Sequence, residues 1–131
     1  MPYRWVDHTS ELELEIAASD EAAVFELALR ALAELLEGGP AGGPVEHALT
    51  ADAPDRAALL AEWLSELVYL AEAHDLIPEA VLSLEFEPGR LRAVVRGRRG
   101  HPRHLVKAVT YHRLALERDG DGWRARVVLD V

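Results

Sequence analysis

Charged and apolar residues alternate strictly over residues 11–16, where three glutamates are interleaved with two leucines and an isoleucine. This two-residue period predicts a β-strand with one buried face. The spacing then changes to the three-to-four-residue period of an amphipathic helix, with Ser19 as the expected N-cap and Gly38-Gly39 as the expected stop. One side of this helix is therefore expected to pack on a sheet. Its apolar stripe consists of Val24, Phe25, Ala28, Leu29, Leu32, Leu35 and Leu36.

A second helix is predicted after a Gly- and Pro-rich loop at residues 38–44 and a short strand at residues 45–50. This helix begins around residues 52–55 and runs to about His74. Its buried stripe consists of Leu59, Leu60, Trp63, Leu64, Leu67 and Leu70.

The rest of the chain has strand patterns. Residues 81–86 and 91–96 form one predicted hairpin, and residues 107–117 and 123–130 form another around an Asp-Gly-Asp-Gly turn. A loop at residues 97–105 separates them. Because strands and helices do not alternate strictly, the predicted class is α+β, with a mostly antiparallel sheet and two helices packed on one face.

Length and composition narrow the class of protein further. A chain of 131 residues is typical of one domain, so residues 1–131 are expected to form a single domain. The chain has no cysteine, which excludes disulfides and thiolate metal sites. No stretch approaches the roughly 20 apolar residues that cross a bilayer. We therefore expect a soluble, cytoplasmic protein without a membrane partner.

The net charge of −9 is distributed unevenly along the chain. Residues 1–75 carry sixteen acidic and three basic side chains, whereas residues 76–131 carry seven acidic and eleven basic ones. The overall charge argues against a stand-alone nucleic-acid-binding protein. The basic run is explained either by a solvated strand face and loop or by a functional patch. It consists of Arg90, Arg92, Arg96, Arg98, Arg99, Arg103, Lys107 and Arg113.

Three oxygen acids near the ends of the chain are candidate metal ligands. Glu11, Asp130 and the α-carboxylate of Val131 would meet if the first and last predicted strands lay side by side. Mg²⁺, Mn²⁺ and Ca²⁺ prefer carboxylate, carbonyl and water oxygens. A solvated strand end would explain Asp130 equally well, because chain termini are commonly exposed.

Other candidate residues are less specific. Lys107 is the single lysine beside thirteen arginines, and an ammonium differs from a guanidinium in shape and hydration. His8 is compatible with a hydrogen-bonded structural role, since imidazole suits zinc or iron better than Mg²⁺. His101 and His104 lie on an Arg-rich loop. The usual signatures of nucleophilic enzymes and nucleotide-binding folds are absent from the sequence.

Four blocks, in this order, resemble the archease family. They are Asp7-His8-Thr9-Ser10-Glu11, the helix segment at residues 59–67, the strand Val106-Lys107-Ala108-Val109-Thr110-Tyr111-His112, and the closing Asp130-Val131. The resemblance extends over nearly the whole chain. It departs from the family pattern at Glu11, where the family usually has Asp, and at Arg98, where it tends to have Glu.

The resemblance implies a non-catalytic cofactor of a GTP-dependent RNA ligase, which joins 3′-phosphate or 2′,3′-cyclic phosphate ends to 5′-hydroxyl ends in tRNA splicing and RNA repair. Such a cofactor would promote guanylylation and multiple turnover of the ligase, and would contact RNA only through that enzyme. The implied metal ligands are Glu11, Asp130 and Val131, with Asp7 and His8 as further ligands or orienting groups. Lys107 would contact a phosphate or a partner carboxylate.

Two other functions remain compatible with the residues. A small metal-dependent phosphohydrolase or nuclease would use the same carboxylates to hold one cation. A chaperone-like modulator of nucleic-acid enzymes would need no metal site.

Overall fold

The structure of the protein is a computed structural model, which describes residues 2–37 and 42–131. The strands and helices of this part of the chain follow one another as β1 (Tyr3–His8), β2 (Glu11–Ala18), α1 (Glu21–Leu36), β3 (Pro44–Asp52), α2 (Arg56–His74), β4 (Leu76–Glu87), β5 (Arg90–Arg99), β6 (Ala108–Asp119) and β7 (Gly122–Asp130).

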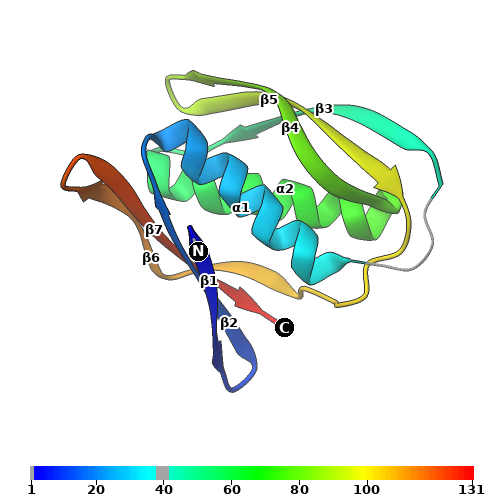
Figure 1. The fold of residues 1–131 in the computed structure, drawn as a ribbon, viewed down its shortest axis with the longest axis horizontal. Coiled ribbons are helices and arrows are strands. Elements are labelled where there is room, and N and C mark those ends of the chain that lie inside the picture. The colour runs from blue at the N-terminus through cyan, green and yellow to red at the C-terminus, as the bar shows by residue number, and fades with distance from the viewer. Residues whose placement is uncertain (1, 38–41) are drawn as a thin grey trace.

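The strands form two separate antiparallel sheets. One sheet has the order β1-β2-β7-β6 and the other the order β3-β5-β4. Both helices contact strands of both sheets, and Figure 1 shows them running between the two. Each sheet therefore has one face turned toward the helices and one face turned away from them. We call the latter the outer face.

The two helices begin where the sequence supplies a side-chain acceptor for the free N–H groups of the first turn. The Asp20 carboxylate accepts a hydrogen bond from Ala23 N at 2.8 Å, so the N-cap is Asp20 and not the expected Ser19. The Asp55 carboxylate accepts a hydrogen bond from Ala58 N at 2.8 Å and caps α2 in the same way. Helix α1 ends at Leu36, and the predicted stop at Gly38-Gly39 lies outside the described residues.

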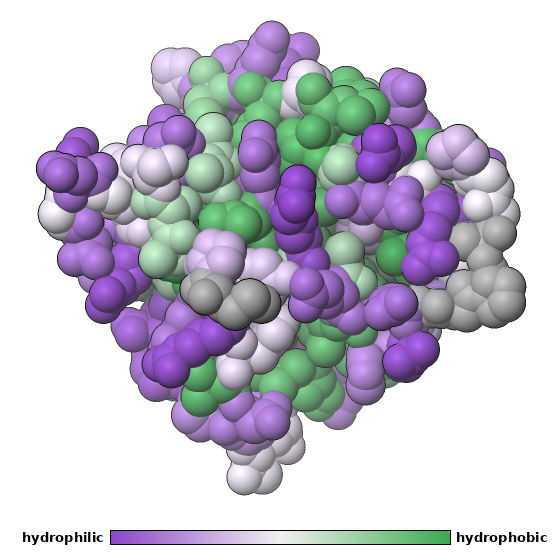
Figure 2. Space-filling view, in the orientation of Figure 1, coloured by the Kyte–Doolittle hydropathy of each residue, from purple (hydrophilic) through white to green (hydrophobic). Residues whose placement is uncertain are grey.

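The core consists of apolar side chains from both helices and the inner faces of both sheets. Trp63 is fully buried, and its indole N–H donates to the main-chain oxygen of Phe25 at 3.0 Å. Phe25 also lies edge-on to Phe86, with ring centroids 5.1 Å apart. Hydrophilic side chains cover much of the face seen in Figure 2, with apolar patches between them. No helix within residues 2–37 and 42–131 is long and apolar enough to span a membrane.

The predicted α+β class, with antiparallel strands and two helices, is confirmed. Besides the N-cap of α1 and the start of β4 at Leu76, where the strand was predicted from residue 81, three details differ from the sequence-based expectation. The strands are divided between two sheets, and β1 was not predicted as a strand. Strand β5 also extends to Arg99, so the loop predicted at residues 97–105 begins at Gly100. The backbone hydrogen bonds that extend β5 come from its neighbours β3 and β4, and such distant partners cannot be read from local composition.

Candidate functional site

The first and last strands of the predicted set are hydrogen-bonded neighbours, as the metal-site hypothesis requires. In the antiparallel register of β2 with β7, Glu11 lies directly opposite Asp130. Directly opposite residues share one face of a sheet, and their Cβ atoms are about 4.5–5.5 Å apart. Leu12 and Leu129, one position further, are also paired, and Leu129 is fully buried. Glu11 and Asp130 therefore lie on the outer face.

Main-chain hydrogen bonds hold the end of β7 in place. Val131 N donates to Ser10 O at 3.1 Å, and Lys107 N donates to Asp130 O at 2.8 Å. Ser10 belongs to the two-residue turn between β1 and β2 and has a positive φ of 64°. The turn thus presents its carbonyl to the last residue of the chain. Because of these contacts, Glu11, Asp130 and Val131 lie at one end of the four-stranded sheet.

The carboxylates of Glu11 and Asp130 are an unfavourable pair unless something neutralises them, since like charges directly opposite each other destabilise a sheet. Within residues 2–37 and 42–131 neither carboxylate forms an ion pair with a basic side chain. Two carboxylates and a neighbouring main-chain oxygen are the donors that a hard divalent cation prefers. The same described residues contain no group of three or more His, Cys, Asp or Glu side chains that could hold a metal. The donor set is thus a pair of side chains, and a cation there would need main-chain or water oxygens as well.

The other predicted site residues lie at different positions relative to this pair. His8 lies opposite Glu11 in the β1–β2 register and so on the same face. Asp7 lies opposite Leu12, and the alternation of the strand places it on the other face. The main-chain nitrogen of Lys107 donates a hydrogen bond to Asp130 O, and its side chain is exposed immediately before β6.

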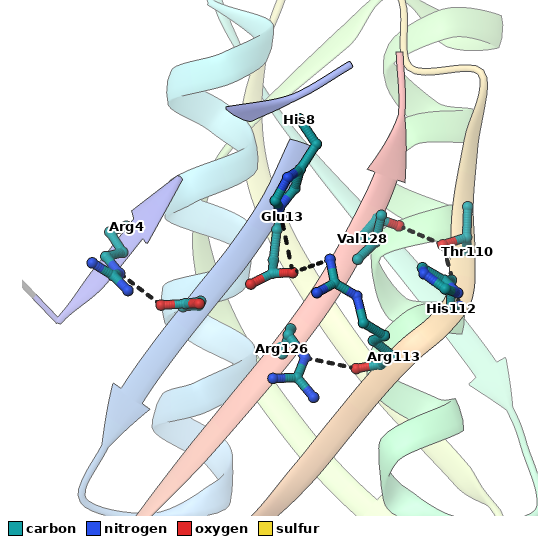
Figure 3. A network of polar contacts seen from close by, with 9 residues as sticks. Arg4, His8, Glu13, Thr110, His112, Arg113, Arg126 and Val128 are labelled. Carbon is teal, nitrogen blue, oxygen red and sulfur yellow. Dashed lines mark hydrogen bonds and ion pairs between the residues drawn. The ribbon is translucent and has the colours of Figure 1, made fainter. Parts of the chain in front are cut away.

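One buried charge near the pair was missed by the sequence analysis. Glu13 is only 5% exposed although it lies on the outer face. Its Oε1 is 2.5 Å from Arg113 Nη2 and 3.9 Å from His8 Nε2, as Figure 3 shows. Oε1 accepts no hydrogen bond from the described residues, so the contact with Arg113 is a close ion pair without ordinary hydrogen-bond geometry.

An irregularity in β6 places Arg113 over Glu13. Between Thr110 and Ala115 the register with β7 shifts, because β6 advances five residues while β7 advances two. Arg113 has a positive φ of 54°, and its carbonyl accepts a hydrogen bond from Arg126 Nε at 2.9 Å. Bulges of this kind redirect side chains near functional sites. No sequence signal marks this one, since residue 113 is neither Gly nor Asn.

Most of the basic side chains in the run from Arg90 to Arg113 form ion pairs with acidic side chains. Arg96 and Arg98 lie 3.9 and 3.6 Å from carboxylate oxygens of Glu79. His101 Nδ1 is 2.8 Å from an oxygen of Asp75. Arg98 is therefore part of an ion-pair cluster on β4 and β5. This geometry favours the solvated strand face over a separate basic patch for this part of the run.

The fold and the site define a class of small α+β protein in which two helices run between two antiparallel sheets, one of which carries a carboxylate pair at one end. The chain belongs to the archease family, because the model of the Archease protein family matches residues 3–131. It is 32% identical to the protein archease of Methanosarcina acetivorans over 139 aligned positions, covering 98% of this chain and 95% of the relative. It is 31% identical to the protein archease of Methanopyrus kandleri, with both chains covered completely.

Solved structures share this fold. The solution structure of protein 1598 from Methanobacterium thermoautotrophicum has a TM-score of 0.72 at 23% identity and covers 99% of each chain. The crystal structure of an archease from Thermotoga maritima, described as a possible chaperone, has a TM-score of 0.69 at 24% identity. That match covers 96% of this chain and 94% of the other. At these identities the similarity establishes the fold.

Proposed function

We propose that this archease activates a GTP-dependent RNA ligase that joins 3′-phosphate or 2′,3′-cyclic phosphate ends to 5′-hydroxyl ends. It would promote guanylylation and repeated turnover of that ligase in tRNA splicing and RNA repair, without catalysing a reaction itself. Family membership supports the role. The observation that carries the proposal is the register that places Glu11 opposite Asp130 on an open sheet face.

The residues at this end of the sheet suit a divalent cation. Glu11 and Asp130 would supply carboxylate oxygens, and Val131 a main-chain oxygen. Mg²⁺, Mn²⁺ and Ca²⁺ are the candidate ions. A bound cation would neutralise phosphate charge at the edge of a partner's nucleotide site. Lys107, exposed beside Asp130, would add a compact positive charge for a phosphate or a partner carboxylate.

The test is ligase guanylylation measured with radiolabelled GTP, with and without this protein. Asp130→Asn should remove the activation because it keeps the shape of the side chain and removes its charge. Asp52→Asn is the matched control, since Asp52 also ends a strand but pairs with Arg90 on the other sheet. Equal activation by wild type and Asp130→Asn would refute the metal-site proposal.

Substitutions of Glu11 give a second test of the metal-site proposal. Glu11→Asp restores the residue usual in the family and shortens the side chain by one methylene. We expect activation to be retained or improved, whereas Glu11→Ala should reduce it. A greater loss for Glu11→Asp than for Glu11→Ala would contradict a ligand role.

The metal-dependent phosphohydrolase alternative is tested on the isolated protein. With a model phosphodiester and Mn²⁺, a ligase cofactor should show no turnover in the absence of the ligase. Turnover that disappears in Asp130→Asn would instead assign the carboxylate pair to an enzyme.

A further inference from the structure

A hollow of about 410 Å³ lies on the outer face of the four-stranded sheet, away from the carboxylate pair. Its charged lining consists of Arg4 on β1, Glu15 on β2, and Arg124 and Arg126 on β7, and Pro2, Tyr3, Ile16 and Ala17 complete it. Three guanidinium groups thus surround one cavity together with a single lining carboxylate. Neither the family resemblance nor the metal-site hypothesis involves these arginines.

The strand register explains why the hollow exists. Arg4 and Arg126 lie on either side of Glu15, and Arg124 lies opposite Ala17. Residues opposite one another share a face of the sheet, so Arg4 and Arg126 flank the Glu15 side chain and Arg124 stands beside the small side chain of Ala17. Arg4 and Arg126 belong to strands that flank β2, so their main chains are roughly 10 Å apart. The Glu15 side chain stands between them and pairs with Arg4, so a phosphate-sized ligand would occupy the part of the hollow lined by Ala17, Arg124 and Arg126.

The cavity carries more positive than negative charge. Arg4 Nε contacts Glu15 at 2.6 Å, and Arg124 Nη2 contacts Asp119 at 3.2 Å. Arg126 donates its Nε to the carbonyl of Arg113, and in the part of the chain that the structure describes it forms no ion pair with a carboxylate. Its terminal nitrogens therefore remain as donors. The hydrogen bond from Arg4 is the largest cause that lowers the pKa of Glu15, and the charges of Arg4 and Arg126 lower it further.

We propose that this arginine pocket binds a phosphate group of single-stranded RNA. Guanidinium groups match the planar oxygen pairs of a phosphate through two parallel hydrogen bonds. The choice of RNA as the source of the phosphate rests on the proposed function, in which RNA ends are present at the ligase. It departs from the sequence-based expectation that RNA contacts this protein only through its partner.

The position of the pocket on the sheet supports a polynucleotide. Along β2 the pocket at Glu15 is four residues from Glu11, which corresponds to roughly 13 Å. The negative charges of the carboxylate pair would repel a strand that passed over this face. A divalent cation held by Glu11 and Asp130 would remove that repulsion, so that both ends of the face would attract phosphates of one strand.

The pocket can be tested by nuclear magnetic resonance on the full chain, in the presence of Mg²⁺ and without ligase. A hexauridylate oligonucleotide is titrated while the arginine Nε–H and the Ala17 amide signals are followed. We expect saturable shifts at Arg4, Arg124 and Arg126. Inorganic phosphate at the same concentration should shift the same signals with much lower affinity, because it makes one contact where a strand makes several. Equal affinities would overturn the assignment to RNA.

Substitutions of single arginines show where the RNA binds. Arg126→Gln should weaken the RNA affinity about five- to tenfold and make it less dependent on salt concentration. Arg90→Gln is the matched control, because Arg90 is exposed, pairs with one carboxylate at 2.7 Å and lies on the other sheet. Equal losses in the two variants, or none in Arg126→Gln, would overturn the pocket.

The outcome is independent of the ligase assay. An Arg126→Gln protein that still binds Mg²⁺ by calorimetry but has lost RNA affinity supports the pocket, whatever the ligase result. Normal RNA affinity in Arg126→Gln refutes the pocket while leaving ligase activation by the carboxylate pair intact.

Discussion

Removing the guanidinium of Arg113 should destabilise the protein more than its surface position suggests. The side chain of Glu13 is 6% exposed, whereas that of Arg113 is 43% exposed. In Arg113→Gln the carboxylate would remain buried without the cation that now lies 2.5 Å away. His8 is the other basic group facing it, at 3.9 Å. A buried charge without a close partner is a main cause of large losses in stability.

The expected loss of stability in Arg113→Gln follows from the exposed fractions of the Glu13 and Arg113 side chains. Breaking a buried ion pair from one side costs about 3–5 kcal/mol. Because Arg113 is partly solvated, water can replace some of its interaction with Glu13, and we expect about 2–3 kcal/mol. For a domain of this length each kcal/mol lowers Tm by about 3–4 °C. Arg113→Gln should therefore unfold roughly 6–12 °C below wild type.

Chemical denaturation followed by circular dichroism measures the change in the free energy of unfolding. Arg90→Gln is the control, since the Arg90–Asp52 contact has a similar distance of 2.7 Å but both partners are well exposed. That variant should lose less than about 1 kcal/mol. The double variant Arg113→Gln/Glu13→Gln removes the unpaired charge and should recover a large part of the loss. Together with the single variant Glu13→Gln it completes the double-mutant cycle that gives the coupling energy of the pair.

The positive φ of Arg113 permits a check on the backbone. Arg113→Asn removes the same charge but tolerates the left-handed conformation better than most residues. Because Gln and Arg have similar backbone preferences, Arg113→Asn should lose less stability than Arg113→Gln, and the difference between the two variants measures the backbone strain at this position. Equal losses for Arg113→Gln and Arg90→Gln would refute the argument that burial of the carboxylate determines the cost.

Three further predictions concern other parts of the molecule. A Cβ atom at Gly97 would lie 2.5 Å from a main-chain oxygen of the neighbouring strand. Gly97→Ala should therefore lower the free energy of unfolding in denaturant by about 1–3 kcal/mol. The control Gly43→Ala places its Cβ in open space and should leave the free energy of unfolding almost unchanged. The hydrogen bond to Glu62, followed by burial, raises the pKa of Tyr111 from 10.0 to about 12. This contribution to stability is present below pH 10 and is lost as the pH rises toward 12, and in Glu62→Gln the tyrosinate absorbance should develop at lower pH. Lys107→Arg should activate the ligase less than wild type because a guanidinium is larger than an ammonium, and full activation would exclude a specific role for the lysine.

Local patterns in the sequence were sufficient to predict most of the elements. The alternation over residues 11–16 predicted β2, and the leucine stripes predicted both helices, because each pattern records which side of an element is buried. The start of α2 around residues 52–55 was also predicted, and the carboxylate of Asp55 caps the helix within its own first turn. Strand β1 (Tyr3–His8) was not predicted, because its residues show no clear alternation and it forms by pairing with β2.

The candidate site depended more on tertiary structure than the elements did. The resemblance to archeases singled out Glu11 and Asp130, but only the β2–β7 register places them opposite each other. The burial of Glu13 and the contact with Arg113 require an irregular stretch of β6. The arginine pocket combines β1 and β2 with β7, which comes from the other end of the sequence.

The physical reason is the range of the interactions involved. Periodicity and capping act over a few residues, so the sequence by itself determines where strands and helices form and which of their faces are apolar. Strand partners, register and bulges are chosen by the free energy of the whole sheet, and a shift of one residue moves every side chain to the other face. Tertiary structure alone therefore decided which charged side chains of the outer face meet at the carboxylate pair, at Glu13 and at the arginine pocket.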